Sequence, residues 1–374
     1  MIYLDNAATT KPDKEILEKA VRYYDENFYN PSALYRGGLD VKKIISEIKS
    51  EILKGFPFME DVVFVSCGSE ADNTAIFSFA RRGNAVTTSG EHSAVYESFN
   101  ELKKRGVEPR YAKLNKDGSV NVENLLSLID EKTSFVSVVH VNNETGAIND
   151  VNYIAEEAKK INPSLVFHCD GVQAYGKIPF KANGKIDLYS VSAHKIGGLK
   201  GVGALVKKKN LVMTPLIFGG GQENGERSGT ENVLGIVDFG MAAKKHNDEI
   251  LKNFEKTQML KGIFLDNLDK RFVEVLSGDN ASPYVISLSA KGLRGEVIMH
   301  MLEEFGIIIG TGSACSSRQR HSRVLKNCGY GANVLDGALR ISLSDETTED
   351  EMLFACEKLN ECVKKLKGVM DRNL

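Results

Sequence analysis

Between residues 61 and 206 the chain repeats one pattern, in which short apolar runs are separated by segments of helical periodicity. The apolar runs lie at residues 62–65, 85–88, 135–139, 165–167, 186–191 and 203–206. Runs of this length are typical of buried strands, and strands that alternate with helices indicate a mainly parallel sheet with right-handed crossovers. The pattern therefore predicts an α/β fold for this part of the chain.

Polar side chains follow these expected strands closely. They include Ser69, His92, Asn143, Asp170, Gln173, Ser192, His194 and Lys195. The carboxyl ends of parallel strands meet at one edge of a sheet, where open α/β sheets bind their ligands. We therefore expect these side chains to converge on a single crevice.

Lys195 ends the sequence Ser192-Ala-His-Lys195, which follows a buried strand and precedes a glycine-rich turn. A lysine at a sheet edge can form a Schiff base with a carbonyl cofactor if its ammonium is partly desolvated or lies near another cation. The alternative is a surface turn with a solvated lysine, and this short motif alone favours that alternative. The choice between them depends on the rest of the chain.

Asp170 follows another buried strand and precedes Lys195 in the chain. A carboxylate that pairs with a protonated pyridine nitrogen keeps the ring an electron sink, which is the partner that pyridoxal phosphate requires. The alternative is a helix N-cap. His92 could stack on a flat ring or move a proton, and Asn143 and Gln173 suit a phenolic oxygen.

The segment 68–70 lies where a strand turns into a helix, and it contains Ser69. Backbone N–H groups and a hydroxyl at a helix N-terminus form an anion site, to which Ser192 and His194 could also donate. The alternative is an ordinary N-cap at Ser69 with Asp72 in the first turn.

The pattern changes after a long helical region at about residues 231–270. Strand-like runs at 272–275, 284–288 and 338–343, with helices near 294–305 and 348–366, predict a smaller α+β unit. We expect an N-terminal segment at 1–15 that packs with the small domain, a large cofactor-binding domain at 16–255, and a small C-terminal domain at 256–374.

Cys315 lies in a loop of small and polar residues with Arg318, Arg320 and His321 close by in the sequence. An electropositive setting of this kind lowers the pKa of a thiol, so Cys315 is a candidate nucleophile. Arg340 projects from an expected strand of the small domain and could bind a carboxylate through two hydrogen bonds, or form a surface ion pair.

Charge and cysteine content exclude several classes of function. The net charge is −2 and no long basic block occurs, so we expect no binding to nucleic acid or membranes. The six cysteines form no Cys-x-x-Cys pair, so neither a disulfide framework nor a metal site is expected. The first residues do not resemble a secretory signal, and a reducing cytoplasm fits best.

Taken in order, the motifs of this chain resemble the cysteine desulfurases of the class V aminotransferase group, which are fold-type I pyridoxal-phosphate enzymes. The matching segments are Tyr3-Leu-Asp-Asn-Ala-Ala-Thr-Thr10, Asn30-Pro-Ser32, Glu91-His92, Asn142-Asn-Glu-Thr-Gly146, His168-Cys-Asp170, Gln173, Ser192-Ala-His-Lys195, Arg227-Ser-Gly-Thr230, Gly312-Ser-Ala-Cys315 and Arg340-Ile-Ser. The resemblance runs essentially end to end, and it implies a seven-stranded, mainly parallel sheet plus a smaller α+β domain.

The resemblance implies a role for each matching residue at a pyridoxal 5′-phosphate site. Lys195 would bind the cofactor covalently, Asp170 would pair with its pyridinium, and His92 would stack on its ring. Asn143 and Gln173 would contact its phenolic oxygen. The phosphate would be held by Ser69, Ser192 and His194. Lys195 and His92 would also take part in catalysis. One departure is Cys67, which stands in the phosphate turn at a position that is usually glycine.

The resemblance also implies the reaction and the assembly. Arg340 and Asn30 would bind L-cysteine, and Cys315 would take its sulfur as a persulfide, leaving L-alanine. Thr230 would reach the phosphate of the other subunit of a homodimer. The persulfide sulfur would then pass to an acceptor protein of unknown identity, for iron–sulfur clusters, tRNA thiolation or cofactor synthesis.

Three alternatives share the fold. A selenocysteine lyase cannot be told from a desulfurase by sequence. A class V transaminase would have no use for a thiol at Cys315. A catalytically idle partner subunit would have no chemical need for Lys195, Asp170 and Cys315 together.

Overall fold

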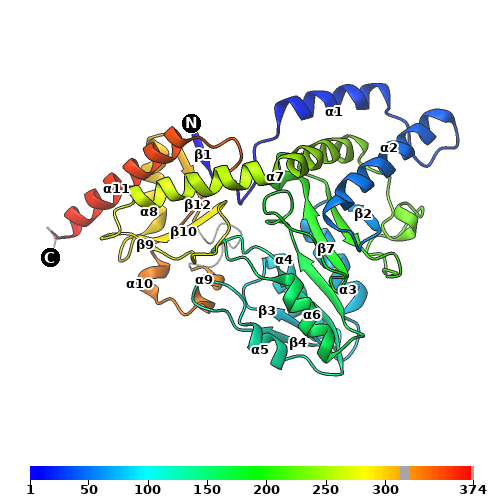
Figure 1. Ribbon diagram of the computed structural model, residues 1–374, viewed down its shortest axis with the longest axis horizontal. Helices are drawn as coiled ribbons and strands as arrows, with labels where there is room; N and C mark the ends of the chain where they lie inside the picture. The colour runs from blue at the N-terminus through cyan, green and yellow to red at the C-terminus, as the bar shows by residue number, and fades with distance from the viewer. Residues whose placement is uncertain (312–320, 372–374) are drawn as a thin grey trace.

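A seven-stranded sheet forms the centre of the computed structural model, which describes residues 1–311 and 321–371 (Figure 1). Its strands are β2 (Asp61–Val65), β3 (Asn84–Thr88), β4 (Glu108–Ala112), β5 (Thr133–Val139), β6 (Val166–Asp170), β7 (Leu188–Ser192) and β8 (Gly203–Lys207), in the order β2-β8-β7-β6-β5-β3-β4. β8 runs antiparallel to both of its neighbours, and the other pairs are parallel. The prediction of a mainly parallel α/β sheet is confirmed.

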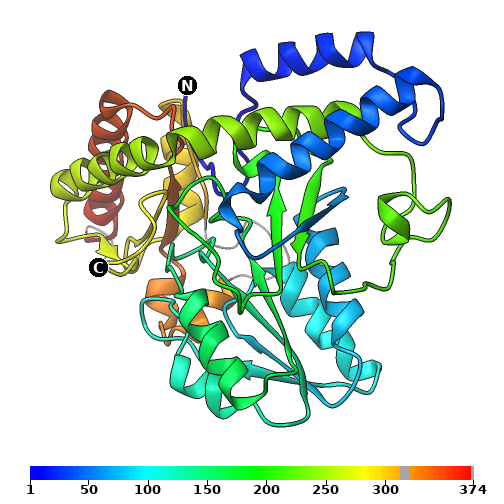
Figure 2. The same ribbon diagram turned by 45° about the vertical axis from the view of Figure 1, so that its right-hand side comes forward.

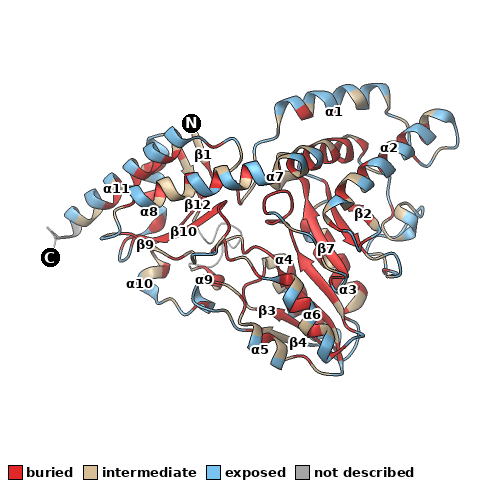
Figure 3. Cartoon of the chain, in the orientation of Figure 1, coloured by how far each residue is buried: buried red, intermediate tan, exposed pale blue. Residues whose placement is uncertain are grey.

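Helices cover both faces of this sheet. The helices of this part are α1 (Lys14–Glu26), α2 (Arg36–Ile52), α3 (Gly68–Phe79), α4 (Ser93–Lys104), α5 (Val122–Ser127), α6 (Val151–Ile161) and α7 (Val233–Asn267). Alternate residues of one strand belong to different cores: Val62 faces the core under α1, α2, α5, α6 and α7, and Val63 faces the core under α3 and α4. Because both faces are covered, the strands are buried along most of their length (Figure 3).

The C-terminal unit contains two small sheets. In one, β10 (Val285–Ser289) pairs antiparallel with β9 (Glu274–Val275) and β12 (Ala338–Ser342); in the other, β1 (Ile2–Leu4) pairs parallel with β11 (Ile307–Ile309). Its helices are α8 (Gly295–Glu304), α9 (Arg323–Asn327), α10 (Ala332–Leu335) and α11 (Glu349–Asp371). The first strand of the chain therefore joins the unit that is built from its last third.

Helix α7 is continuous between the two units. It packs on α1 and α2 toward its N-terminal end and on α11 toward its C-terminal end (Figure 2). The expected boundary at 255/256 lies inside this helix, and the division there stays a prediction. No helix in the described ranges is long and apolar enough to cross a bilayer.

Three strands were not predicted. β4 contains Pro109 and several polar residues, which is characteristic of the edge strand that it forms. β1 and β11 have three residues each and pair over a long distance in sequence, so neither has a local pattern that identifies it.

Candidate active site

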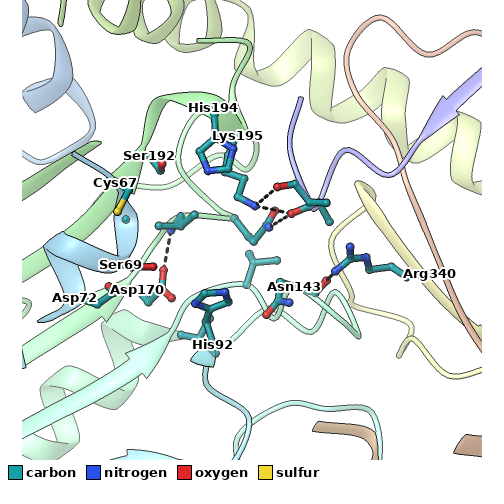
Figure 4. A pocket seen from close by; sticks show the side chains of 17 residues that line it. Cys67, Ser69, Asp72, His92, Asn143, Asp170, Ser192, His194, Lys195 and Arg340 are labelled. Carbon is teal, nitrogen blue, oxygen red and sulfur yellow. Dashed lines mark hydrogen bonds between the residues drawn. The ribbon is translucent and has the colours of Figure 1, made fainter. Parts of the chain in front are cut away.

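A cavity of about 220 Å³ opens at the carboxyl ends of the central strands (Figure 4). Nine of the predicted site residues line it: Ser69, His92, Asn143, Asp170, Gln173, Ser192, His194, Lys195 and Arg340. The expectation that these side chains converge on one crevice is confirmed. The individual roles that the resemblance gives them stay predictions.

Lys195 ends η2 (Ala193–Lys195), a 3₁₀ turn that directly follows β7. Its Nζ donates hydrogen bonds to the backbone carbonyls of Ala7 at 2.7 Å and Ala8 at 2.8 Å. Thr10 fastens the same turn from the N-terminal segment, because its Oγ1 donates to the carbonyl of His194 at 2.9 Å. The N-terminal segment thus holds the ammonium at the cavity wall.

Asp170 is the last residue of β6, next to β7, and its side chain is buried in the cavity wall. Its Oδ1 accepts a hydrogen bond from the backbone N–H of Val172 at 3.0 Å. Burial raises the pKa of the Asp170 carboxyl, although His92 and Lys195 act in the opposite direction. A cation bound in the cavity would stabilise this buried carboxylate.

His92 is the N-cap of α4, and its Nδ1 accepts a hydrogen bond from the backbone N–H of Ala94 at 3.2 Å. Burial lowers the pKa of His92, which favours the neutral ring. A neutral ring that accepts at Nδ1 carries its proton on Nε2.

The N-terminus of α3 forms another wall of the cavity. The helix begins at Gly68, and its N-cap is Cys67, which makes no side-chain cap hydrogen bond within the described residues. The alternative that placed the N-cap at Ser69 is therefore wrong by two residues, because the backbone turns helical earlier. A Cβ added at Gly68 would lie 2.8 Å from Cγ2 of Val172, so this wall requires glycine.

Polar atoms at this wall are available to an anion. Ser192 Oγ is buried and has no hydrogen-bond partner in the part of the chain that is described. His194 Nδ1 lies 3.1 Å from Thr9 Oγ1, and burial lowers the pKa of His194 to about 4. Hydroxyl and N–H donors at a helix N-terminus suit a phosphate group.

Arg340 crosses from β12 of the C-terminal unit to the opposite side of the cavity (Figure 4). It donates to Oδ1 of Asp5 at 2.8 Å and to the carbonyl of Asn143 at 2.9 Å. Its Nε is buried and unpartnered among the residues that the structure describes. A ligand carboxylate could accept from this group.

Three buried titratable side chains at or beside the cavity are not among the predicted site residues. Glu91 Oε1 accepts from Thr88 Oγ1 at 2.7 Å and from the backbone N–H of Val139 at 3.0 Å, and burial raises the pKa of Glu91 to about 8. Burial, and next the charge of Asp170, raises the pKa of Asp72 well above its ordinary value.

His168 is the third of these buried groups. Its two ring nitrogens lie 2.9 Å from the hydroxyls of Ser137 and Ser190, and burial lowers its pKa to about 3. Its Nε2 is also 3.7 Å from Oδ1 of Asp72, but a neutral ring gives that carboxyl no counter-charge. Asp72 could have been found from sequence, because it lies four residues after Gly68 and so on the same helix face.

Two predicted site residues lie away from this cavity. Asn30 is exposed in the turn between α1 and α2, where its Oδ1 accepts from the backbone N–H of Ser32 at 2.8 Å. This contact gives Asn30 a local structural role, and its assignment to the substrate stays a prediction. Thr230 is exposed and lines a separate cavity with Glu223 and Arg227.

Cys315 lies outside the described residues, and so do Arg318 and Arg320. The next two basic residues are engaged within the fold. His321 Nε2 lies 2.8 Å from Oδ1 of Asp336, and Arg323 donates to the backbone carbonyls of Ser89 and Glu91. Arg323 thus connects the start of α9 to the loop that carries His92.

Comparison with known proteins gives consistent similarities. A family model described as aminotransferase class V matches residues 2–353. The cysteine desulfurase IscS of Dictyoglomus turgidum is 35% identical over 98% of this chain and 96% of its own length. A solved structure described as a NifS-like protein is 32% identical, covers 97% of this chain and 99% of that chain, and has a TM-score of 0.90. The structure of SspA in complex with cysteine is 27% identical, covers 93% and 100%, and has a TM-score of 0.81.

Replacing Glu91 with glutamine should weaken the pH dependence of stability. Burial raises the folded-state pKa of Glu91 from 4.5 to about 8, so between these values the folded chain keeps a proton that the unfolded chain has released. This group therefore makes the free energy of unfolding fall as the pH rises through that window. Urea titrations should show a smaller fall for Glu91→Gln than for wild type, because glutamine keeps the acceptor oxygen and cannot ionise.

The matched control is Glu97→Gln, at an exposed position on α4. The free energy of unfolding of this variant should fall as steeply with rising pH as that of wild type. An equally steep fall in Glu91→Gln would contradict the buried, protonated state of Glu91.

Proposed function

The chain belongs to the class V aminotransferase family, among its NifS-like cysteine desulfurases, and we propose that its cavity holds pyridoxal 5′-phosphate and acts on L-cysteine. The observation that carries the proposal is the placement of Lys195 and Asp170. Asp170 ends β6, Lys195 follows the neighbouring strand β7 through the turn η2, and both line one cavity. An amine and a buried carboxylate in this arrangement are what an aldehyde on a protonatable pyridine ring requires.

The chemistry of the cavity fits this cofactor. Asp170 is a buried carboxylate that lines the cavity, and a pyridinium nitrogen would neutralise its charge. Ser192 Oγ is a buried hydroxyl without a partner in the described ranges, as expected of a group that would donate to a bound phosphate.

We assign the residues that would hold the cofactor by these chemical matches. Lys195 would bind the aldehyde carbon, Asp170 the ring nitrogen, His92 the ring face, Asn143 and Gln173 the phenolic oxygen, and Ser69, Ser192 and His194 the phosphate. When bound, the cofactor supplies an electron sink that stabilises negative charge at the substrate. Specificity and proton movement then depend on the side chains of this chain.

Arg340 would bind the carboxylate of L-cysteine, because it lines the cavity, its Nε is buried without a partner in the described ranges, and Asp5 and Asn143 already fix its guanidinium. The Lys195 amine would accept and return protons. The Cys315 thiolate would attack the substrate sulfur, so that an S–S bond forms as the C–S bond breaks. The electron pair left on the substrate carbon takes up a proton to give L-alanine, and Cys315 keeps the sulfur as a persulfide.

The persulfide would then pass to an acceptor protein. We propose iron–sulfur cluster assembly, tRNA thiolation or cofactor biosynthesis as the processes that take up this sulfur. Cys315 must be a free thiol at the start of each cycle, and transfer of the persulfide sulfur to the acceptor restores that form. We therefore also propose that the protein works in the cytoplasm, where thiols are kept reduced.

Cys315→Ala should abolish alanine formation from L-cysteine. The purified protein is supplied with pyridoxal phosphate and a thiol reductant, which releases the persulfide sulfur as sulfide, and L-alanine and sulfide are measured for wild type, Cys315→Ala and Cys362→Ala. Cys362 lies in α11, in the core of the C-terminal unit, so its substitution should leave turnover in place. Alanine formation that survives in Cys315→Ala would contradict the persulfide role and favour selenocysteine lyase chemistry. Keto-acid formation from amino acids would favour a transaminase.

We also propose a homodimer in which Thr230 completes the phosphate site of the other subunit. Thr230 is exposed and lies away from the cavity of its own chain. The segment 209–231 and the turn between α1 and α2 project from the same side of the molecule (Figures 1 and 2). They expose large apolar side chains: Val212 is 81% exposed, Phe218 78% and Leu34 90%. Burial of such surface is a common driving force for dimerisation.

Analytical ultracentrifugation should give a mass twice the 41.1 kDa of the chain. Phe218→Asp should shift the protein toward the monomer, because a carboxylate would be buried without a partner. Phe58→Asp, at a position that is exposed outside these two segments, should leave the mass unchanged. A monomeric wild type would contradict the proposal.

A further inference from the structure

A short loop connects β3 to α4 and leads directly to His92, which lies in the wall of the cavity (Figure 4). Successive backbone carbonyls of this loop accept hydrogen bonds from side chains of other elements. Arg323 of α9 donates to the carbonyls of Ser89 and Glu91, and the carbonyl between them accepts from Nδ2 of Asn142 at 2.9 Å. The course of the chain into His92 is therefore set by side chains that are distant in sequence.

Arg323 is suited to hold two carbonyls at once. Its guanidinium presents its N–H groups in a rigid plane, and Nη1 and Nη2 donate to different carbonyls of the loop. Its Cζ also lies 3.8 Å from the ring centre of Tyr96, in the first turn of α4. Arg323 thus contacts the chain both before and after His92.

Helix α9 is anchored by contacts that do not involve the Arg323 side chain. Ser322 is buried, and its Oγ caps α9 and donates to the carboxylate of Glu144. Nδ2 of Asn327 donates to the carbonyl of Ser89 at 3.0 Å. A shortened side chain at position 323 would leave these contacts in place, and the carbonyl that loses its donor would be that of Glu91.

The Glu91 carbonyl belongs to the peptide group that ends at the nitrogen of His92. Because a peptide group is planar, the hydrogen bond from Arg323 fixes the plane directly before His92. His92 is the N-cap of α4, and its Nδ1 accepts from the backbone N–H of Ala94 at 3.2 Å. A cap bond of this kind requires the non-helical backbone conformation that precedes the helix.

We propose that Arg323 is a positioning residue for His92: by holding the Ser89 and Glu91 carbonyls, it fixes the imidazole in its place in the cavity wall. The inference rests on the proposed function, in which His92 lies against the cofactor ring. It extends that function to a residue of the C-terminal unit that is not among the described residues lining the cavity.

The test measures how fast His92 reacts with diethyl pyrocarbonate in the full-length chain after removal of cofactor with hydroxylamine. The reagent acylates the unprotonated nitrogen of a neutral imidazole, which in His92 is the Nδ1 that Ala94 occupies. Rates are read at neutral pH by peptide mass spectrometry. Arg323→Met should raise the His92 rate about fivefold, the factor that corresponds to loss of one ordinary hydrogen bond. Arg323→Lys keeps a cationic donor, and its rate should lie between the two.

The other histidines distinguish positioning from a general loss of structure. His140 and His168 are buried at the central sheet, and His300 is exposed on α8 and serves as the reference for reagent activity. Equal increases at His92, His140 and His168 would overturn the proposal, as would an unchanged rate at His92. Lys326→Met, at an exposed position on α9, is the matched control and should react like wild type.

A change in charge cannot produce the expected result. Burial lowers the pKa of His92, Asp170 opposes this shift, and the charges of Lys195 and Arg323 add to it. Loss of the Arg323 charge therefore favours the protonated ring, which does not react. A faster reaction at His92 in Arg323→Met reports release of Nδ1.

A double-mutant cycle tests the consequence for the cofactor. The Kd of pyridoxal phosphate is measured by absorbance titration for wild type, Arg323→Met, His92→Ala and the double variant. Arg323→Met should weaken binding severalfold in the wild-type background and cause no further loss in the His92→Ala background. Equal weakening in both backgrounds would overturn the proposal. A wild type that binds no pyridoxal phosphate would contradict the proposed function, whereas the reactivity of His92 would still decide the role of Arg323.

Discussion

The hydrogen bonds from Lys195 to the carbonyls of Ala7 and Ala8 connect the parts of this molecule on which the site depends. The lysine comes from the end of β7 in the large sheet, and the carbonyls come from the N-terminal segment. That segment is itself tied to the C-terminal unit, because β1 pairs with β11 and Asp5 forms an ion pair with Arg340. One contact therefore aligns the lysine proposed to bind the cofactor with the arginine proposed to bind the substrate.

Buried charge is the second theme of the site. Asp170 and Asp72 lie on one side of the cavity and Arg340 on the other (Figure 4). Burial raises the pKa of both aspartates, because it removes their carboxylates from water. A ligand with a protonated ring nitrogen and an anionic group would supply the missing partners. This distribution of charged side chains supports the proposed binding of pyridoxal phosphate.

The sequence was most informative where local pattern and site coincide. Asp170 and Lys195 could be placed because each ends an apolar run, and strand ends in a parallel sheet share an edge. The positions of Ala7, Ala8 and Lys177, the lysine that donates to Gln173, could not be predicted from sequence. Their contacts depend on backbone carbonyls or on tertiary packing between distant segments. The N-cap of α3 was misplaced because Cys67, the actual cap, is not a residue that favours this position. The thiol of Cys315 was identified from sequence chemistry, and its role stays a prediction.

The measurement that tests the account most directly is the site of covalent cofactor attachment. The protein is loaded with pyridoxal phosphate, reduced with borohydride, digested and mapped by mass spectrometry. The account predicts a reduced adduct on Lys195 in wild type, no modification of Lys177, and loss of the adduct in Lys195→Ala. An adduct on Lys177 or another lysine, or bound cofactor without any covalent adduct, would contradict it.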